Sequence, residues 1–374
     1  MLGDELDGPR GRIYLIKQVL EGAQPTTKTR LHLDRCLSCR SCESTCPSGV
    51  QYTRLLDIGR EVVESKVPRT GGDAFMRGAL KNLLPRSMLF GAAMKMGQAV
   101  RLLLPGVLRA MVPPLSSAGP VPQRRHARRL IALAGCVQPS MYPNVNGATR
   151  RVLDRLGIQM IEAAGAGCCG AVRAHLNAAE GAREDARRNI DAWWPLLESG
   201  AEGLVMTASG CGSHVLEYAH LLQDDPDYAL KAARVVLATR DISEVITAEA
   251  AALAPLLQAC LPLPESERVL AFHSPCSLQH GLKIRGTVES LLAAAGYTLT
   301  EVADSHLCCG SAGTYSVLQP ALSQRLLENK LAALTAGGPA AIASANVGCI
   351  GHMQGATDVP VKHWIEVLDE RLSS

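Results

Sequence analysis

Cysteines recur along the chain as two copies of one pattern: a single cysteine, then Cys-Cys-Gly, then Cys-x-x-His. The first copy is Cys136, Cys168-Cys169-Gly170 and Cys211-Gly-Ser-His214; the second is Cys276, Cys308-Cys309-Gly310 and Cys349-Ile-Gly-His352. Cys276 follows Cys136 by 140 residues, Cys308 follows Cys168 by 140, and Cys349 follows Cys211 by 138. An offset that stays at 138–140 residues over three separate sites predicts a duplicated domain.

The segments around these cysteines predict the same elements in both copies. Short apolar runs at 129–134, 203–207, 268–272 and 340–345 are typical of buried strands, and amphipathic patterns at 148–156, 178–197, 286–295 and 320–336 are typical of helices. The order β-α-β-α-β-α, twice, predicts two α/β domains with parallel sheets. Every repeated cysteine then follows the carboxyl end of a strand, where open α/β sheets bind their ligands.

Three functional interpretations of each cysteine set stay open. Four thiolates suit a metal centre, either iron–sulfur or zinc, and the adjacent pair suits a dithiol that cycles with a disulfide. The set is also compatible with a structural relic that lines a substrate or acceptor pocket. We favour a metal or redox centre in at least one copy. Cys260 lies outside both patterns and is expected to be a plain buried thiol on a helix.

Histidines distinguish the second copy from the first. His273 and His306 precede Cys276 and Cys308, whereas the first copy has no histidine at those places. A neutral histidine near a redox site can move protons, so both residues are candidates for proton transfer, with loop hydrogen bonding as the equal alternative. For His214 and His352, a cap or core role is the default and metal ligation the alternative.

A separate run of four cysteines lies near the N-terminus: Cys36, Cys39, Cys42 and Cys46, followed by Pro47. The spacing C-x₂-C-x₂-C-x₃-C-P is that of a bacterial [4Fe–4S] ferredoxin-type ligand run. Zinc sites usually separate two Cys-x-x-Cys pairs, and disulfide frameworks are typical of small secreted chains. The run therefore predicts an iron–sulfur cluster.

The fourth cysteine of such a run ligates the other cluster in two-cluster modules, and the chain has no second quartet of this spacing. Two alternatives follow. Either Cys46 folds back to close its own cluster, or the chain lacks its natural beginning. We favour the second, because the segment after Met1, Gly3-Asp-Glu-Leu-Asp-Gly-Pro-Arg-Gly-Arg12, is typical of a domain interior.

Composition narrows the class of protein. Thirteen cysteines without a secretion signal indicate a reducing, cytoplasmic compartment. The net charge of +3 is too small to indicate nucleic-acid binding. Residues 66–129 nevertheless carry twelve Lys and Arg against Asp73 alone, interleaved with Leu, Met and Phe. This segment predicts basic amphipathic helices that form an interface, either with an anionic membrane surface, such as the cytoplasmic face of the inner membrane, or with an acidic partner. The alternative, which we favour over direct membrane contact, is a solvated linker whose apolar side packs on its own domain.

No Gly-rich dinucleotide fingerprint, phosphate loop or nucleophile elbow is present in the sequence. A chain with iron–sulfur ligands and no site for an organic cofactor is expected to relay electrons that a partner protein supplies.

These residues resemble the iron–sulfur subunit of bacterial glycolate oxidase (glycolate dehydrogenase). The resemblance covers nearly the whole chain and rests on Leu33-Asp-Arg-Cys-Leu-Ser-Cys39, Thr45-Cys-Pro-Ser-Gly-Val50, Ala166-Gly-Cys-Cys-Gly-Ala171, Asn189-Ile-Asp-Ala-Trp-Trp-Pro195 and Asp304-Ser-His-Leu-Cys-Cys-Gly-Ser-Ala-Gly-Thr-Tyr315. The Cys-Cys-Gly motifs alone are shared with heterodisulfide reductase subunits, anaerobic glycerol-3-phosphate dehydrogenase and lactate-utilisation proteins.

The resemblance implies a complex in which FAD-binding subunits oxidise glycolate to glyoxylate and this subunit passes the electrons, through two [4Fe–4S] clusters, toward a membrane acceptor such as quinone. Family members begin with another cysteine quartet that is missing here, so the chain can complete at most one ferredoxin-type cluster. In several relatives the last motif is Cys-x-x-Cys, whereas both copies here have Cys-x-x-His, so a five-cysteine cluster does not carry over directly.

The expected organisation is a helical ferredoxin-like region at 1–65, a basic helical linker at 66–128, and cysteine-rich α/β domains at 129–245 and 246–374. Two alternative functions stay open: an electron-transfer subunit for another hydroxy acid or for glycerol 3-phosphate, and a thiol–disulfide enzyme like heterodisulfide reductase.

Overall fold

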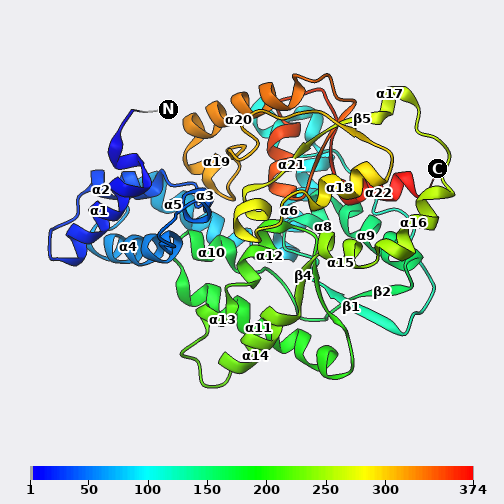
Figure 1. Cartoon of the computed structure of the whole chain (residues 1–374). Coiled ribbons are helices and arrows are strands. Elements are labelled where there is room, and N and C mark those ends of the chain that lie inside the picture. The colour runs from blue at the N-terminus through cyan, green and yellow to red at the C-terminus, as the bar shows by residue number, and fades with distance from the viewer. Residues whose placement is uncertain (1–2, 374) are drawn as a thin grey trace.

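The computed structural model describes residues 3–373 and begins with a helical N-terminal lobe, drawn in blue in Figure 1. The lobe contains η1 (Glu5–Asp7), α1 (Pro9–Leu20), α2 (Thr27–Asp34), α3 (Ser41–Ser44) and α4 (Tyr52–Lys66). Its small core includes Ile16 of α1, Leu33 of α2 and Leu56 of α4. This core lies directly behind the first cysteine quartet, because Cys36 and Cys42 pack against it.

Short helices connect this lobe to the rest of the chain: α5 (Gly71–Leu83), α6 (Ser87–Ala99), η2 (Arg101–Leu103) and α7 (Gly106–Met111). Phe90 and Met94 of α6 are buried, whereas Leu102 and Leu103 are 79% and 86% exposed. Arg69 forms ion pairs with Asp34, Glu64 and Asp73, so part of the positive charge of this segment is neutralised within the protein.

The first repeat contains four strands and nine helices among the described residues. Its elements are β1 (Arg128–Ala132), α8 (Gln138–Met141), α9 (Pro143–Arg155), β2 (Ile158–Glu162), α10 (Ala171–His175), α11 (Ala179–Glu198), β3 (Gly203–Met206), α12 (Ser209–Val215), α13 (Tyr218–Leu221), α14 (Ala229–Ala238), β4 (Thr239–Asp241), α15 (Ile242–Ala248) and α16 (Ala250–Gln258).

The second repeat follows the same order with fewer helices. Its elements are α17 (Glu265–Arg268), β5 (Val269–His273), η3 (Ser277–Gly281), α18 (Thr287–Ala294), β6 (Thr298–Leu299), α19 (Tyr315–Leu318), α20 (Pro320–Thr335), β7 (Ala341–Ser344), α21 (Val347–Gln354), β8 (Val361–His363) and α22 (Trp364–Arg371).

Each repeat builds one parallel four-stranded sheet, in the order β2-β1-β3-β4 and β6-β5-β7-β8. The registers match between repeats, since Leu130 pairs with Gly203 in the first sheet and Leu270 pairs with Ala341 in the second. The continuous apolar character of the central strands is typical of parallel sheets that are covered on both faces. The predicted fold class is therefore confirmed. The fourth strands, β4 and β8, were not predicted.

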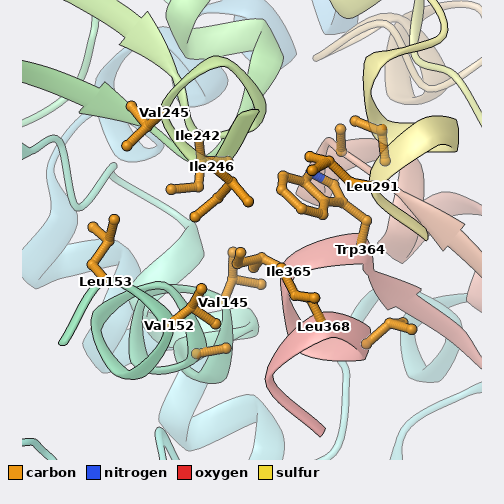
Figure 2. Packing of buried hydrophobic residues seen from close by; sticks show 14 of the residues in the cluster. Val145, Val152, Leu153, Ile242, Val245, Ile246, Leu291, Trp364, Ile365 and Leu368 are labelled. Carbon is orange, nitrogen blue, oxygen red and sulfur yellow. The ribbon is translucent and has the colours of Figure 1, made fainter. Parts of the chain in front are cut away.

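The two repeats share one hydrophobic core, in which two helices of the first repeat pack against two helices of the second. Helix α9 packs against α22, and α15 packs against α18. Figure 2 shows Val152 and Leu153 of α9, Ile246 of α15 and Trp364 of α22 directed into the space between these helices. This reciprocal contact fixes the relative position of the two sheets.

In both repeats a helix begins directly after the fourth strand, with the same capping arrangement. Asp241 accepts a hydrogen bond from the backbone N–H of Ser243, and Glu244 accepts one from the N–H of Asp241. In the second repeat, His363 and Glu366 form the equivalent capping box. The proposed domain division at residues 65, 128 and 245 stays a prediction; residue 245 lies within α15.

Every repeated cysteine lies beyond the carboxyl end of a strand, as predicted. Cys136 follows β1 and Cys276 follows β5, while Cys211 and Cys349 lie on α12 and α21, which follow β3 and β7. Cys260 differs from the expectation, because it is half-buried and lies just past the end of α16. No helix within residues 3–373 is both long and apolar enough to cross a bilayer.

Candidate iron–sulfur and cysteine sites

The loop that carries the first cysteines is held in an unusual conformation. Ser38 and Arg40 have φ values of 52° and 61°, in the left-handed region that non-glycine residues rarely adopt. The buried guanidinium of Arg60 on α4 fixes this loop, donating hydrogen bonds to the carbonyl oxygens of Leu33 (2.9 Å) and Cys36 (3.0 Å). Arg60 was missed by the sequence analysis.

Three of the four thiols in this quartet lie near one another. Burial, with the nearby thiols of Cys36 and Cys39, raises the pKa of Cys42 to about 11. The pKa of Cys46 is instead lowered, because its sulfur accepts hydrogen bonds from the backbone N–H groups of Val50 and Ser48. The structure thus brings Cys36, Cys39 and Cys42 together and directs Cys46 into the turn that follows.

This donor set fits an iron–sulfur cluster better than a zinc ion. Zn–S bonds of about 2.3 Å place neighbouring ligands about 3.8 Å apart. Among the described residues, no three of the quartet's thiols gather with their sulfurs within 4.8 Å of one another. In a cluster, each thiolate binds a different iron, so its ligand sulfurs lie further apart. The four residues stay the predicted ligands of the [4Fe–4S] group.

The quartet lies directly against the second repeat. The side chain of Cys276 lowers the pKa of Cys39, and the thiol of Cys308 also acts on Cys39. The Oγ atom of Ser44 is 2.8 Å from Nδ1 of His280, and Tyr315 donates a hydrogen bond to the carbonyl oxygen of Arg35 (3.2 Å).

The same loop contacts the first repeat through Arg40, which forms an ion pair with Glu217 (2.8 Å). The ferredoxin-type loop therefore lies between the two repeats, with its cysteines on the side of the second.

In the first repeat, the four predicted cysteines converge. The side chains of Cys136 and Cys169 lower the pKa of Cys168 to about 3. The pKa of Cys169 is raised by the side chains of Cys168 and Cys211 and by burial. Such a chain of interacting thiols, one of them favoured as a thiolate, is the donor set of a metal or redox centre.

Gly170 is required at this corner, since it has a φ of +93°. A Cβ there would also stand 3.1 Å from the carbonyl oxygen of Ala182 on α11. The Cys-Cys-Gly motif is therefore a tight corner packed on the long helix that follows it.

The second repeat gathers its own four cysteines. The side chains of Cys308 and Cys39, with burial, raise the pKa of Cys276. Cys309 interacts with the thiols of Cys308 and Cys349. The predicted cysteine sets are therefore brought together in both repeats; their roles as metal or redox centres stay predictions.

The histidines occupy different positions relative to these thiols. His273 is 2% exposed, and one of its ring nitrogens, Cys309 Sγ and Cys349 Sγ all lie within 4.8 Å of one another. Burial lowers the pKa of His273 to about 3, so its imidazole is neutral at physiological pH. His306 is exposed, and its carbonyl oxygen is 3.2 Å from Nε2 of His280. Proton transfer by His273 or His306 stays a prediction.

The motif histidines also differ from each other. Nε2 of His352 is 3.1 Å from Oγ of Ser323 on α20; the cap or core role expected for this histidine stays a prediction. Nε2 of His214 is buried without a hydrogen-bond partner in the described structure, near Cys168.

Two residues of the second site were missed by the sequence analysis. Ser344 ends β7, and its Oγ is 3.0 Å from Nδ1 of His273. Lys330 of α20 is 3% exposed, and its Nζ donates a hydrogen bond to the carbonyl oxygen of Asp304 (2.8 Å). Burial lowers the pKa of Lys330, and the nearby thiols of Cys276, Cys309 and Cys308 act in the opposite direction. The 140-residue offset could have singled out Lys330 in the sequence, because the equivalent residue of the first repeat is the apolar Ile190.

Comparisons with known proteins agree with this arrangement. The family of the cysteine-rich CCG domain matches residues 131–215 and 270–354. The "Glycolate oxidase iron-sulfur subunit" of Escherichia coli (strain K12) is 51% identical over 373 residues, covering 100% of this chain and 90% of that protein.

More distant relatives follow. The "Probable glycolate oxidase iron-sulfur subunit" of Bacillus subtilis (strain 168) is 31% identical over 383 residues, covering 94% of this chain and 83% of that protein. "Lactate utilization protein A" of the same strain is 28% identical over 246 residues, covering 63% of this chain and 97% of that protein. The two relatives named for glycolate oxidase are thus similar over nearly the full length. The chain belongs to the family of glycolate oxidase iron–sulfur subunits.

Proposed function

We propose that this protein is the electron-transfer subunit of a glycolate-oxidising complex. The names of its relatives support a glycolate oxidase with further subunits, and we expect these partners to bind FAD and to oxidise glycolate to glyoxylate. Cys36, Cys39, Cys42 and Cys46 are the ligands in this chain for [4Fe–4S] chemistry, which supplies one-electron acceptance and release when the cluster is bound. The organic substrate is handled by the partner.

The observation that carries this proposal is the contact between two separate cysteine sites. Cys39 of the N-terminal loop meets Cys276 and Cys308 of the second repeat. A redox group held by the quartet would thus be adjacent to one held by the repeat, and such adjacency is what a relay requires. The chain contributes fixed geometry here, through Arg60 within the loop and Tyr315 and Ser44 between the loop and the repeat.

The decisive test uses the full chain with its flavoprotein partner, assayed anaerobically with glycolate and a one-electron dye. Cys42→Ser should lose most of the iron of the quartet and most dye reduction, while glycolate still bleaches the flavin in a single turnover. Cys42 is chosen because the side chain of Cys39 interacts with Cys276, so that a change at Cys39 would disturb the second repeat as well. Cys260→Ser is the matched control, since this thiol lies outside all three sites.

Unchanged iron content and dye reduction in Cys42→Ser would contradict the proposal. The same assay with lactate and glycerol 3-phosphate addresses the alternative substrates, because a preference for either would assign the complex to another dehydrogenase. Dithiol or disulfide turnover by the chain alone would instead favour a thiol–disulfide enzyme.

We further propose that electrons leave toward a quinone at the cytoplasmic face of the inner membrane, through peripheral contact by the helices that connect the lobe to the repeats. Met88, Leu102 and Leu103 are exposed there beside basic residues of the same segment, and this combination suits an anionic lipid surface. Leu102→Asp with Leu103→Asp should reduce binding to phosphatidylglycerol vesicles. Leu230→Asp with Leu237→Asp on α14, which are equally exposed but outside this segment, should not.

A further inference from the structure

Helix α14 of the first repeat directs two leucines away from the protein. Leu230 and Leu237 are 87% and 72% exposed, whereas Ala232 and Val235 on the opposite face are fully buried. Figure 1 shows α14 at the lower margin of the molecule, and it packs on α11 and α13. The outer face of a surface helix is normally polar, so this face is suited to contact with another molecule.

The exposed residues of α14 follow the spacing of a helix–helix contact. Leu230, Ala233 and Leu237 are separated by three and four residues, which is the a and d pattern of a coiled coil. Arg234 is exposed beside them. The small side chain of Ala233 at the middle allows a second helix to approach closely, because the distance between packed helices depends on the side chains at the contact.

The two ends of this face carry opposite charges. Asp227 comes just before α14 and Arg240 just after it, and both are exposed. The Nη1 atom of Arg240 donates hydrogen bonds to the carbonyl oxygens of Leu237 (2.8 Å) and Thr239 (2.8 Å), so the guanidinium lies at the carboxyl end of the helix. Within residues 3–373, neither Asp227 nor Arg240 has an ion-pair partner.

An antiparallel copy of the same helix complements all of these features in one register. We propose that α14 binds α14 of a second copy of this chain across a two-fold axis that passes between residues 233 and 234. Three kinds of contact form: Leu230 with Leu237, Ala233 with Arg234, and Asp227 with Arg240. Both members of each pair are equally far from the axis, which is the self-complementarity that a two-fold interface requires. We call these six residues the α14 seam.

The charges of the seam select this partner and this direction. In the antiparallel register each Asp227 meets an Arg240, so that two ion pairs form, and the helix dipoles are also opposed favourably. A parallel register would place Asp227 against Asp227 and Arg240 against Arg240, and like charges at an interface are unfavourable. A uniformly acidic or uniformly basic partner would complement only one end of the seam.

The seam is held in place before any partner binds. Tyr228, at the amino end of α14, donates a hydrogen bond to Asp191 of α11 (2.8 Å). The Nζ atom of Lys231 lies 5.8 Å from the ring centroid of Trp194 on α11, within the range of a cation–π contact. A preformed surface loses less conformational freedom on association, so the fixed helix favours binding.

The size of the seam indicates a weak dimer. Helix α14 has ten residues and is therefore about 15 Å long. One pair of such helices is smaller than the interfaces of about 1,200–2,000 Å² that hold stable complexes together. Association should therefore depend on protein concentration. The inference goes beyond the proposed function, because it concerns the outer surface of the first repeat and depends on none of the cysteines.

The first test is sedimentation equilibrium of the full chain over a wide range of concentration, with excess reductant so that disulfide-linked dimers do not form. Wild-type protein should show a reversible monomer–dimer equilibrium. Leu230→Asp with Leu237→Asp should remain monomeric at every concentration, because the two-fold axis places four carboxylates in the contact. Leu261→Asp is the matched control, since Leu261 is 69% exposed and lies beyond α16. It should dimerise like wild type.

The second test exchanges the charges at the ends of the seam. Asp227→Arg and Arg240→Asp each replace two attractive contacts by two repulsive ones, and each alone should weaken dimerisation at least about 10-fold. An equimolar mixture of the two variants should dimerise about as tightly as wild type. In the mixed dimer one chain has arginine at both positions and the other has aspartate at both, so every contact is attractive again.

Three results would overturn the proposal: wild-type protein that stays monomeric at all concentrations, dimerisation that persists in Leu230→Asp with Leu237→Asp, or a mixture that associates no more tightly than the single variants. Loss of binding to the flavoprotein in the leucine variant, with self-association unchanged, would assign the face to that partner and overturn it as well. Cys42→Ser should dimerise like wild type, so a failure of the electron-transfer proposal would leave this result unaffected.

Discussion

The two repeats share a fold and a cysteine pattern but surround their thiols with different chemistry. Around Cys169 in the first repeat, Leu133, Ile190 and Met206 form part of an apolar cluster. Around Cys309 in the second, the same positions hold His273, Lys330 and Ser344, all buried. The backbone frame is thus a common support, and the residues at the strand ends and on the long helices α11 and α20 decide what each site can bind.

The contact with the N-terminal lobe follows the same division. Cys39 meets the thiols of the second repeat, whereas the first repeat is approached by the Arg40–Glu217 ion pair. A duplicated domain can thereby give one copy a place next to the ferredoxin-type loop and keep the other in a more apolar surrounding. The comparison is open to direct tests.

Exchanging the buried charge between the repeats is expected to have the largest effect. Ile190→Lys places an ammonium group in the apolar cluster of the first repeat, among residues such as Leu133, Trp193 and Met206. We expect the free energy of unfolding to fall by about 3–5 kcal/mol, the usual cost of an uncompensated buried charge. Urea unfolding of the reduced, metal-free protein measures this loss.

The reverse exchange, Lys330→Ile, is the control. It removes hydrogen bonds to the carbonyl oxygens of Asp304 and Ser305, two exposed residues whose carbonyls water can reach. A loss below about 2 kcal/mol is expected. Equal losses in the two variants would mean that the surroundings of the two sites do not differ as described.

The glycines of the Cys-Cys-Gly corners give a smaller contrast. Gly170 and Gly310 have φ values of 93° and 90°, so alanine at either position is strained by about 1–3 kcal/mol. At Gly310 a Cβ would also collide with the carbonyl oxygen of Ser323, whereas at Gly170 the nearest atom is 3.1 Å away. Gly310→Ala should therefore lower Tm more than Gly170→Ala.

Gly78 on α5 is the matched control, because a Cβ there meets no atom within 4 Å. Gly78→Ala should leave stability unchanged or raise it by up to about 1 kcal/mol, owing to the higher helix propensity of alanine. An equal decrease in Tm for all three variants would contradict the proposed role of the corners.

Local patterns predicted most of the fold. The strand expected at 129–134 is β1 (Arg128–Ala132), and the helix expected at 320–336 is α20 (Pro320–Thr335). The strands β4 (Thr239–Asp241) and β8 (Val361–His363) were missed because three residues are too few to show a hydrophobic period. Their existence depends on pairing with β3 and β7.

The cysteine sets were also predictable, since spacing brings each to the end of its strand. The contact of Cys39 with Cys276 was not, because it joins residues more than 200 positions apart in domains that share no local pattern. The histidine asymmetry between the copies was visible in the sequence. Lys330 was equally visible through its offset from Ile190, but a buried lysine has no sequence signature apart from that comparison.

The smallest expected contrast is in the pH dependence of the two capping boxes. Burial raises the pKa of Asp241 from 3.8 to about 6, and burial lowers the pKa of His363 from 6.5 to about 4. The contribution of Asp241 to stability is full below pH 3.8 and is lost as the pH rises through about 6. The contribution of His363 is present above pH 6.5 and is lost as the pH falls through about 4.

Between pH 7 and pH 6 the two repeats should therefore respond in opposite directions. Relative to His363→Asn, wild type should lose about 0.7 kcal/mol of unfolding free energy over that interval, because protonation of this imidazole is favoured only after unfolding. Relative to Asp241→Asn, wild type should gain about 0.4 kcal/mol, because the folded carboxyl binds the proton. Asparagine can cap a helix in both variants, and urea unfolding at the two pH values gives both differences. If the two differences have the same sign, burial does not shift the pKa values of Asp241 and His363 in opposite directions, as inferred for the two repeats.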